Sequence, residues 1–322
     1  QRGVVIGAGA KYKTIRLSTL TSASGAASAL YILGSDYNTV TGSHISNPAS
    51  FGAYLNAGSD YNTISQSTMI SNSAGSIALY LDSSDSNTVT GSFMQNMAGG
   101  ALYLQSGADY NAISLSTMVA NAAAHYGLFV NNSDSNTMTG SYIQNLLGAA
   151  VTLLAGSDYN MISFSTMTNN DSATYALDFD GSGYNTVTGS FLSNPSGTAV
   201  RIINTAYNTI SLSTMTTANP GNNALYLFNS DTNTVSGSYL ANPGGTPLWL
   251  NVGSDYNVIS QSTMATNAGG SRAFTTLNSD FNLVTRSMMS NPSGISAYLD
   301  TGSDYNVIDQ STMTSNSSLL AS

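Results

Sequence analysis

The chain has 322 residues, of which 7% are charged and none is cysteine, and its formal net charge is −9 at pH 7. Because phosphate binding needs clustered Lys and Arg, this acidic balance argues against a nucleic-acid partner. The lack of cysteine excludes a disulfide framework and a thiolate metal site. No apolar run approaches the ~18 to 20 residues that span a bilayer, so no membrane span is expected. We also expect no cofactor.

An asparagine recurs at steps of 24 or 25 residues, with a single step of 23, along the whole chain. This column contains Asn38, Asn62, Asn87, Asn111, Asn136, Asn160, Asn185, Asn208, Asn233, Asn257, Asn282 and Asn306. Self-similarity at a fixed period is typical of stacked-repeat proteins. The sequence therefore predicts a single β-solenoid domain over residues 1–322, which is a segment or subunit of a longer fibre.

Within each coil the sequence predicts three short strands joined by turns. Because side chains alternate along a strand, Asn62 and Ile64 face the core while Thr63 and Ser65 face outward. A second asparagine marks another turn nine or ten residues later, and a third strand then carries an apolar-x-apolar pattern. The coils alternate between an Asn-Thr-Val-Thr-Gly-Ser type and an Ile-Ser-x-Ser-Thr-Met type, so the true repeat is about 49 residues long.

The recurring Asn-x-(Ile/Val)-x…Asn pattern resembles the right-handed parallel β-helix repeats of the pectate-lyase-like superfamily, of the non-enzymatic repeat type. The resemblance covers essentially the whole chain. It implies three parallel sheets, right-handed coiling and an internal ladder of asparagines at a turn. We therefore expect an all-β fold, a right-handed parallel β-helix (β-solenoid) of about 13 coils of 24–25 residues. Each inward Asn can bond the Asn of the next coil, so that the column satisfies its own amides.

Composition and repeat number favour a structural role. Scarce Lys and Glu with abundant Ser, Thr, Asn and Gly are associated with secreted surface proteins. Gln1 precedes Lys13 by twelve residues and Ser322 follows Asn306 by sixteen, so the chain holds close to a whole number of coils. We expect a structural β-solenoid rod of an extracellular or cell-surface fibre or adhesin, which self-associates head to tail or by lateral packing.

A ladder of aromatic residues is predicted to point outward from the third strand of most coils. It contains Tyr31, Tyr54, Tyr80, Tyr103, Phe129, Tyr226, Trp249 and Tyr298. The ladder is a candidate polysaccharide-binding surface, because aromatic faces stack on sugar rings, and it could equally pack against a neighbouring rod. The structural alternative is that tyrosine has a high β propensity and stacks on itself.

The aromatic ladder is interrupted by Thr152, Asp178 and Arg201. Asp178 and Arg201 lie on adjacent coils, and a surface salt bridge is the favoured interpretation of this pair over a small polar site. A glycoside hydrolase needs two carboxylates flanking the scissile bond. Asp178 and Asp180 are available, but nothing in the sequence supports that role. Because the clustered Asp pairs, His and basic residues of the superfamily's enzymes are missing, we predict no catalytic residues and no enzymatic activity.

Outward threonines flank the core aliphatic residue of the first strand in several coils and suggest an ice-binding face as a second alternative. The pairs are Thr39 and Thr41, Thr88 and Thr90, Thr137 and Thr139, and Thr186 and Thr188. A flat Thr-x-Thr array resembles the ice-binding face of solenoid antifreeze proteins. Ala112 and Met161 interrupt the array, and threonine is also a common outward residue of strands.

An aspartate stands two residues before the ladder asparagine in ten coils. Calcium bridging between coils is one interpretation, and Asp36, Asp60, Asp85 and Asp109 are its weak candidates. The favoured interpretation is that each carboxylate accepts backbone N–H groups of its turn. The repeats also lack the Gly-Gly-x-Gly-x-Asp pattern of calcium-binding β-rolls. We therefore predict no metal site.

Overall fold

The computed structural model describes residues 2–316. Its 39 strands fall into three sets of thirteen, with one strand of each set in every coil, and residues 2–316 contain no helix. The all-β fold of three parallel sheets and about 13 coils is thus confirmed. The prediction that the chain holds a whole number of coils depends on Gln1 and Ser322, and both lie outside the described residues. The chain contains two compact units, the residues up to Thr166 and those from Met167 onward.

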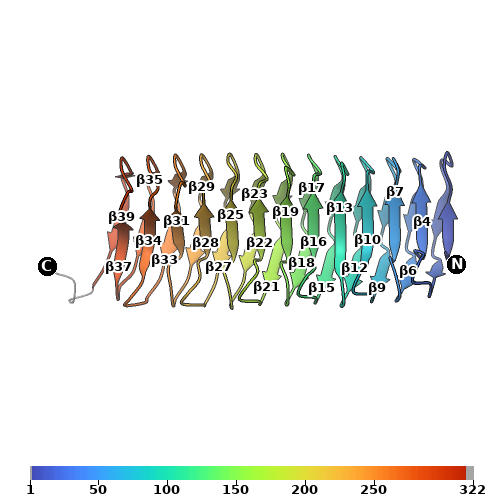
Figure 1. Ribbon diagram of the computed structural model, residues 1–322, viewed down its shortest axis with the longest axis horizontal. Coiled ribbons are helices and arrows are strands. Elements are labelled where there is room, and N and C mark those ends of the chain that lie inside the picture. Colours follow the sequence, from blue (N-terminus) through green and yellow to red (C-terminus); the bar gives the residue numbers. More distant parts are fainter. Residues whose placement is uncertain (1, 317–322) are drawn as a thin grey trace. The chain divides into compact units, whose positions relative to one another are not determined.

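In the first unit every coil contributes one strand to each of three parallel sheets, and Figure 1 shows β4 to β19 of sheet A side by side. Sheet A contains β1 (Val4–Ile6), β4 (Leu30–Leu33), β7 (Ala53–Asn56), β10 (Ile77–Asp82), β13 (Gly100–Gln105), β16 (Leu128–Asn131) and β19 (Val151–Leu154). Sheet B contains β2 (Thr14–Arg16), β5 (Thr39–Thr41), β8 (Thr63–Ser65), β11 (Thr88–Thr90), β14 (Ala112–Ser114), β17 (Thr137–Thr139) and β20 (Met161–Ser163). Sheet C contains β3 (Thr19–Thr21), β6 (His44–Asn47), β9 (Thr68–Ser71), β12 (Phe93–Asn96), β15 (Thr117–Ala120) and β18 (Tyr142–Asn145).

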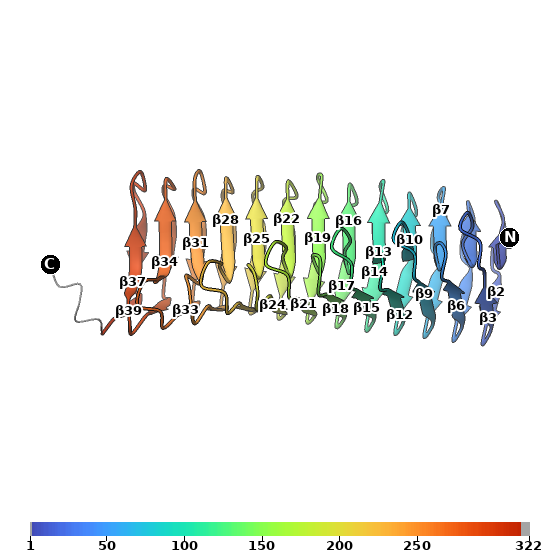
Figure 2. The same ribbon diagram turned by 60° about the horizontal axis from the view of Figure 1, so that its bottom comes forward.

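The second unit repeats this arrangement, and Figure 2 shows its sheet A strands β25, β28 and β31 side by side. Its sheet A contains β22 (Leu177–Asp180), β25 (Val200–Ile203), β28 (Leu225–Phe228), β31 (Leu248–Asn251), β34 (Arg272–Leu277) and β37 (Ile295–Leu299). Its sheet B contains β23 (Thr186–Thr188), β26 (Thr209–Ser211), β29 (Thr234–Ser236), β32 (Val258–Ser260), β35 (Leu283–Thr285) and β38 (Val307–Asp309). Its sheet C contains β24 (Phe191–Ser193), β27 (Thr214–Thr216), β30 (Tyr239–Ala241), β33 (Thr263–Ala265), β36 (Met288–Ser290) and β39 (Thr312–Thr314). The strand β21 (Thr166–Asn169) begins at the last residue of the first unit.

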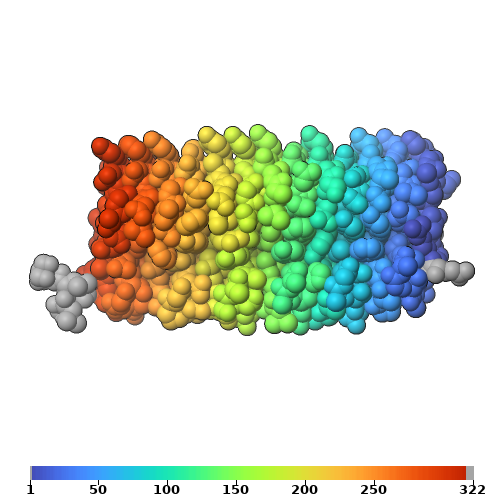
Figure 3. All heavy atoms as spheres, in the orientation of Figure 1, coloured from blue at the N-terminus to red at the C-terminus, as the bar shows by residue number. Residues whose placement is uncertain are grey.

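The core of each unit consists of columns of like residues, because parallel strands in register place equivalent side chains one above the other. In sheet B, Val40 pairs with Ile64 and Ile64 with Val89, and all three are almost completely buried. The space-filling view shows successive coils of the first unit in close contact on the visible face (Figure 3). Apolar burial along these columns stabilises each coil only through its immediate neighbours.

The asparagine before each sheet-B strand is buried and links neighbouring coils. Oδ1 of Asn62 accepts the backbone N–H of Asn38 at 2.8 Å, and Oδ1 of Asn87 accepts that of Asn62 at 2.8 Å. The Nδ2 group of Asn62 donates to the carbonyl of Ser35 at 2.9 Å. The recurrent bond therefore runs from side chain to backbone, and an amide-to-amide bond accompanies it only in some coils, as between Asn38 and Asn62 at 3.0 Å.

The second asparagine is buried only in every other coil of the first unit. Asn47 and Asn96 are fully buried, whereas Asn72 is exposed and Ser71 lies in register with both of them. The coil that carries Ser-Thr-Met has one more residue between its two asparagines. Its second asparagine consequently lies one residue beyond the buried position.

The two coil types differ at the corner between sheets B and C, where the chain adopts a left-handed conformation. Gly42 (φ 56°) occupies this corner in one coil, and Leu17 (φ 49°) occupies it in the preceding coil. A Cβ atom on Gly42 would lie 2.9 Å from Cδ2 of Leu17. The large corner side chain of one coil thus covers the glycine of the next, which explains the alternation of Thr-Gly-Ser with Ser-x-Ser.

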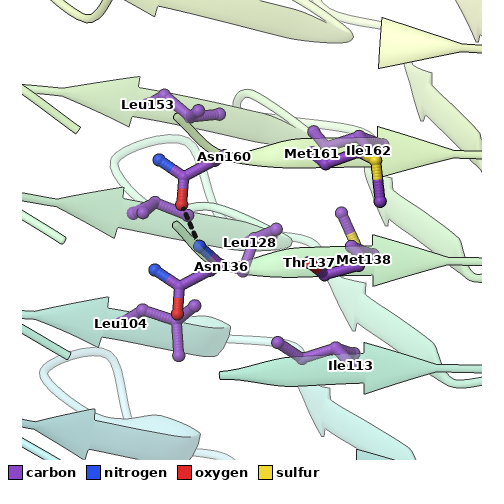
Figure 4. Close-up of a pocket in the computed structure, with 11 residues that line it drawn as sticks. Leu104, Ile113, Leu128, Asn136, Thr137, Met138, Leu153, Asn160, Met161 and Ile162 are labelled. Carbon is purple, nitrogen blue, oxygen red and sulfur yellow. Dashed lines mark hydrogen bonds between the residues drawn. The ribbon is translucent and has the colours of Figure 1, made fainter. Parts of the chain in front are cut away.

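The core of the first unit contains a small apolar cavity of about 20 Å³ (Figure 4). Val130 lines it and lies in register between Leu104 and Leu153, which have one more methylene group each. Beside it, the N–H of Asn136 donates to Oδ1 of Asn160 at 2.8 Å. The shorter valine side chain in a column of leucines accounts for the cavity.

Candidate functional site

In the first unit, the predicted aromatic ladder lies on the outer face of sheet A and packs on itself. The ring centroids of Tyr54 and Tyr80 are 4.9 Å apart, and those of Tyr103 and Phe129 are 5.1 Å apart. Side chains from the preceding turns cover the ladder, and Phe51 lies 5.3 Å from the ring of Tyr54. Tyr31, Tyr103 and Phe129 are consequently buried, so this part of the ladder is a second small apolar core and not an open platform.

Burial also changes the acidity of this ladder. Desolvation raises the pKa of Tyr80 to about 12, and the nearby Asp82 carboxylate adds to the shift. Burial also raises the pKa of Tyr54. A second cause adds to this shift, because the Tyr54 hydroxyl donates to Oδ2 of Asp82 at 2.9 Å. Tyr103 has a raised pKa for the same main reason, burial. The hydroxyl of Tyr54 thus donates to a carboxylate, and the hydroxyl of Tyr103 lies 3.1 Å from Nδ1 of His125.

In the second unit the same outer column contains a polar segment. Asp178 pairs in register with Arg201, and Arg201 pairs with Tyr226. Nε and Nη2 of Arg201 donate to Oδ1 and Oδ2 of Asp178 at 2.7 and 2.8 Å, and Nη2 lies 3.5 Å from Oδ2 of Asp180. Only 6% of Asp178 is exposed, so the predicted salt bridge exists but is not a surface one. Burial raises the pKa of Asp178, and the hydrogen bonds from Arg201 oppose that shift.

A groove of about 240 Å³ lies beside this ion pair. Its lining residues are Ser172, Tyr175, Thr198, Gly221, Asn222, Asn223, Tyr226 and Trp249. The guanidinium carbon of Arg201 lies 4.4 Å from the ring centroid of Tyr175, and the rings of Tyr226 and Trp249 meet edge to face at 5.6 Å. The groove therefore combines aromatic faces with amide and hydroxyl groups from neighbouring coils.

Several buried polar atoms near the groove have no hydrogen-bond partner among the described residues. They include Nε1 of Trp249, Oδ1 of Asn251 and Oγ1 of Thr275. Trp249 pairs in register with Thr275, so two of these atoms belong to adjacent coils. Buried polar atoms are normally paired, and because these three are shielded from solvent, a ligand in the groove would meet the aromatic faces and not these atoms.

The last member of the predicted ladder, Tyr298, lies in register with Thr275 and outside the groove. Its ring is covered by Arg272, whose guanidinium carbon is 4.3 Å from the ring centroid. Thr152, which interrupts the ladder in the first unit, pairs in register with Phe129 and is buried.

The predicted threonine face forms the outer side of sheet B. Its hydroxyl groups bond to one another between coils, as Ser65 to Thr41 at 3.0 Å and Ser114 to Thr90 at 2.9 Å. These pairs engage the second hydroxyl of each Thr-x-Thr motif within the protein. Fewer hydroxyl groups of this face are therefore free to order surface water.

The aspartate column bonds to the backbone of the next coil. Oδ1 of Asp60 accepts the N–H of Asp85 at 2.7 Å, and Oδ1 of Asp85 accepts that of Asp109 at 2.9 Å. Asp36 accepts the N–H of Asp60 in the same way at 3.3 Å. Residues 2–316 contain no group of three or more His, Cys, Asp or Glu side chains that could hold a metal ion.

Sequence reasoning passed over a further aromatic ladder, at the turn before sheet B. The residue between the column aspartate and the ladder asparagine is an exposed tyrosine in many coils, with a left-handed backbone, as at Tyr37 and Tyr61 (φ 57° and 55°). Their rings stack at 5.1 Å with an interplanar angle of 7°. The recurring Asp-Tyr-Asn triplet was the signal that could have predicted this ladder.

Comparison with known proteins supports the fold at the level of a family. A family model described as right-handed β-helix region matches residues 1–123 and 78–214, which together cover more than half of the chain. No curated protein sequence matches the chain. Within residues 2–316, no helix is present that could cross a membrane.

Solved structures with a similar fold share little sequence with the chain. The Dettilon tailspike protein (gp208) is 14% identical with a TM-score of 0.53, over 89% of this chain and 60% of the tailspike. A double mutant of the periplasmic alginate epimerase AlgG is 10% identical with a TM-score of 0.56, over 94% of this chain and 75% of the epimerase. DFA-IIIase from Arthrobacter chlorophenolicus A6 is 11% identical with a TM-score of 0.56, over 88% of this chain and 90% of the DFA-IIIase. The chain thus spans less than two thirds of the tailspike.

The prediction that this chain is not an enzyme is wrong. Solved structures that share its fold are mostly enzymes, among them the alginate epimerase, DFA-IIIase and the Agl-KA catalytic domain. The sequence argument failed because it required a familiar catalytic cluster, whereas fold and catalytic residues vary independently. At these identities the likeness extends to the fold, which tailspikes and such enzymes share. The chain belongs to the right-handed β-helix family.

Proposed function

We propose that this protein binds a polysaccharide in the groove on the outer face of sheet A of the second unit, at the cell surface or outside the cell. The observation that carries the proposal is the groove between Tyr175, Tyr226 and Trp249, which amide and hydroxyl side chains also line. The fold that the chain shares with an alginate epimerase supports a carbohydrate ligand.

The chemistry of the groove suits sugar rings. Aromatic faces pack against the C–H faces of sugars and exclude water from them. Asn222, Asn223 and Thr198 supply amide and hydroxyl groups that can bond sugar hydroxyls. From β22 to β31 the site covers three coil steps of ~4.8 Å each, which is longer than one monosaccharide. An extended polymer lying along the coils therefore fits better than a free sugar.

The groove also indicates the charge of the glycan. The guanidinium of Arg201 is engaged by Asp178 and lies close to Asp180, so this ion-pair cluster has no excess positive charge. The whole chain carries a net charge of −9. A uronic acid polymer would be repelled at long range, so we expect a neutral glycan to bind more tightly.

Retention on immobilised glycans tests the proposal. We expect Trp249→Ala and Tyr226→Ala each to lower the affinity for the retained glycan about tenfold, as loss of an aromatic anchor does. Tyr239→Ala serves as a control, because Tyr239 is an exposed tyrosine on sheet C outside this groove. Unchanged retention of both groove variants would refute the proposal. Analysis of the retained glycan for shortened chains then shows whether the protein also cleaves it.

A structural role in a surface fibre is a second candidate, favoured by the ladders that tie each coil only to its neighbours. Such a protein stabilises longer assemblies by adding equivalent coils. Electron microscopy at low protein concentration should then show filaments, and a strictly monodisperse monomer would count against this role.

A further inference from the structure

The turn tyrosines of the first unit form a stack with gaps. Where the ladder is uninterrupted, successive rings lie nearly parallel, at 5.5 Å for Tyr12 and Tyr37 and at 5.1 Å for Tyr37 and Tyr61. Ser86 and Ser135 then replace tyrosine on either side of Tyr110. The backbone does not change at Ser86, because its φ of 56° matches the 55° and 57° of Tyr61 and Tyr110. Only the ring is missing, so each serine leaves an open slot in the stack.

The exposed fraction of each tyrosine rises where a neighbouring ring is missing, as expected for open slots. Tyr37 has a ring on both sides and is 43% exposed, Tyr61 has one on a single side and is 54% exposed, and Tyr110 is 66% exposed. Two coil steps of ~4.8 Å separate the rings that flank a slot by about 10 Å. A group at the centre of the slot thus lies ~5 Å from both ring centroids, within the ~6 Å range of a cation–π interaction.

Carboxylates line the same edge of the turn. Oδ1 of Asp85 accepts the N–H of Asp109 at 2.9 Å, and Oδ1 of Asp109 accepts that of Asp134 at 2.7 Å. These bonds fix the carboxylates and leave Oδ2 of Asp85 and Asp109 for a ligand. Each slot therefore presents two aromatic faces and negative charge, which together favour a cation over a neutral ring.

The chain itself shows how an ammonium group binds to this ladder. Lys11 occupies the aspartate position of the first coil, and its Nζ lies 3.1 Å from Oδ2 of Asp36. The same Nζ is 5.6 Å from the ring centroid of Tyr37. The hydrogen bond with Asp36 raises the pKa of Lys11. A carboxylate and a turn tyrosine together thus hold one ammonium group, and the slots offer two rings in place of one.

We propose that the slots at Ser86 and Ser135 bind the ammonium groups of a linear polyamine. The two slots are two coils apart, or about 10 Å, so one flexible polyamine can reach both. Its charge is complementary to the aspartate column and to the net charge of the chain. This site is separate from the groove of the second unit, and either can exist without the other.

Filling the slots tests this proposal. Spermine is titrated into the full chain by calorimetry at low salt, and the double variant Ser86→Tyr and Ser135→Tyr is compared with the wild type. The added rings continue a stack that the fold already contains, so the variant should keep its circular dichroism spectrum and Tm. We expect its affinity for spermine to fall at least tenfold. Ser83→Tyr, in the same coil but outside the slot, should leave the affinity unchanged.

A second pair of variants separates the aromatic contribution from the charge. Tyr110→Ala removes the ring that both slots share, and Asp85→Asn removes a carboxylate while keeping its shape. Both should weaken spermine binding, and only Asp85→Asn should reduce its salt dependence. If the slot-filled variant binds spermine as tightly as the wild type, binding depends on net charge alone and the proposal is wrong. Absence of heat with the wild-type chain would equally overturn it.

Discussion

Arg201 and Asp178 form a two-pronged ion pair between adjacent coils, with Nε to Oδ1 at 2.7 Å and Nη2 to Oδ2 at 2.8 Å. The Tyr175 ring lies against the same guanidinium at 4.4 Å. Such fork-to-fork geometry fixes the orientation of both side chains. The pair thereby holds one side of the proposed glycan groove in a single arrangement.

Removal of Asp178 should be strongly destabilising. Asp178→Ala leaves the partly buried guanidinium of Arg201 with one distant carboxylate, and breaking a buried ion pair costs on the order of 3 kcal/mol of unfolding free energy. Asp180→Ala is the control, because its contact is 3.5 Å long and 36% of its side chain is exposed. That variant should lose under about 1 kcal/mol. Equal losses in chemical denaturation would contradict the assigned geometry.

Asn96 and Asn72 form a matched pair of second asparagines. Nδ2 of Asn96 donates to the carbonyls of Ser73 and Ser76 at 3.1 and 2.6 Å, whereas Asn72 is exposed. Asn96→Ala should lower the free energy of unfolding by about 1 to 3 kcal/mol, because it removes both bonds to these carbonyls and leaves the N–H of Ala98 without the Oδ1 that accepts it at 3.0 Å. Asn72→Ala should change it by less than about 0.5 kcal/mol. Denaturant midpoints of the two variants check this, and a large effect of Asn72→Ala would contradict the alternation.

The cavity beside Val130 should accept one more methylene group. Val130→Leu restores the leucine found in register on both neighbouring coils and should stabilise the protein by about 0.8 kcal/mol. Val40→Leu is the control, since Val40 is fully buried and does not itself line the cavity. Overpacking there should destabilise by about 1 to 3 kcal/mol. Thermal unfolding compares the variants, and a lower Tm for Val130→Leu would refute the explanation.

Tyr80 should resist ionisation in the folded protein. Burial raises its pKa to about 12, whereas a tyrosine of an unfolded chain ionises near pH ~10. Between these values the unfolded state has lost a proton that the folded state retains. The stability due to Tyr80 is thus complete below pH ~10 and is lost as pH rises toward ~12.

Tyrosinate absorbance during an alkaline titration measures this effect. Tyr80→Phe should remove part of the late ionisation. Full ionisation of every tyrosine near pH ~10 in a folded sample would contradict the burial of the ladder.

The fold could be predicted from the sequence because its information is local and periodic. The aliphatic column that contains Val40 and Ile64 alternates with polar residues, and this alternation alone identifies the inner face of a strand. The aromatic residues of the third strand were expected to form an open outward ladder. Their burial was not predicted, because Phe51 and Tyr126 reach them from turns whose paths no period encodes.

The candidate sites were less accessible to sequence reasoning. Trp249, Tyr226 and Tyr175 come from positions 23 or more residues apart and from both a strand and a turn. The sequence showed two of them as ladder members and did not show the third. The sequence contains the turn tyrosines in a recurring Asp-Tyr-Asn triplet. Their stacking could not be predicted from it, because it depends on a left-handed backbone at each tyrosine.

By itself, the sequence determined the period, the inward columns, the alternation of two coil types and hence the parallel β-helix. These follow from repetition, because equal steps along the chain place like residues one above the other. Only the tertiary structure decided which outer residues are covered, that Asp178 is buried against Arg201, and that the turn tyrosines stack on one another. Those outcomes depend on how turn side chains from neighbouring coils fold over the sheet, and contacts across coils carry no signature in the order of residues within one coil.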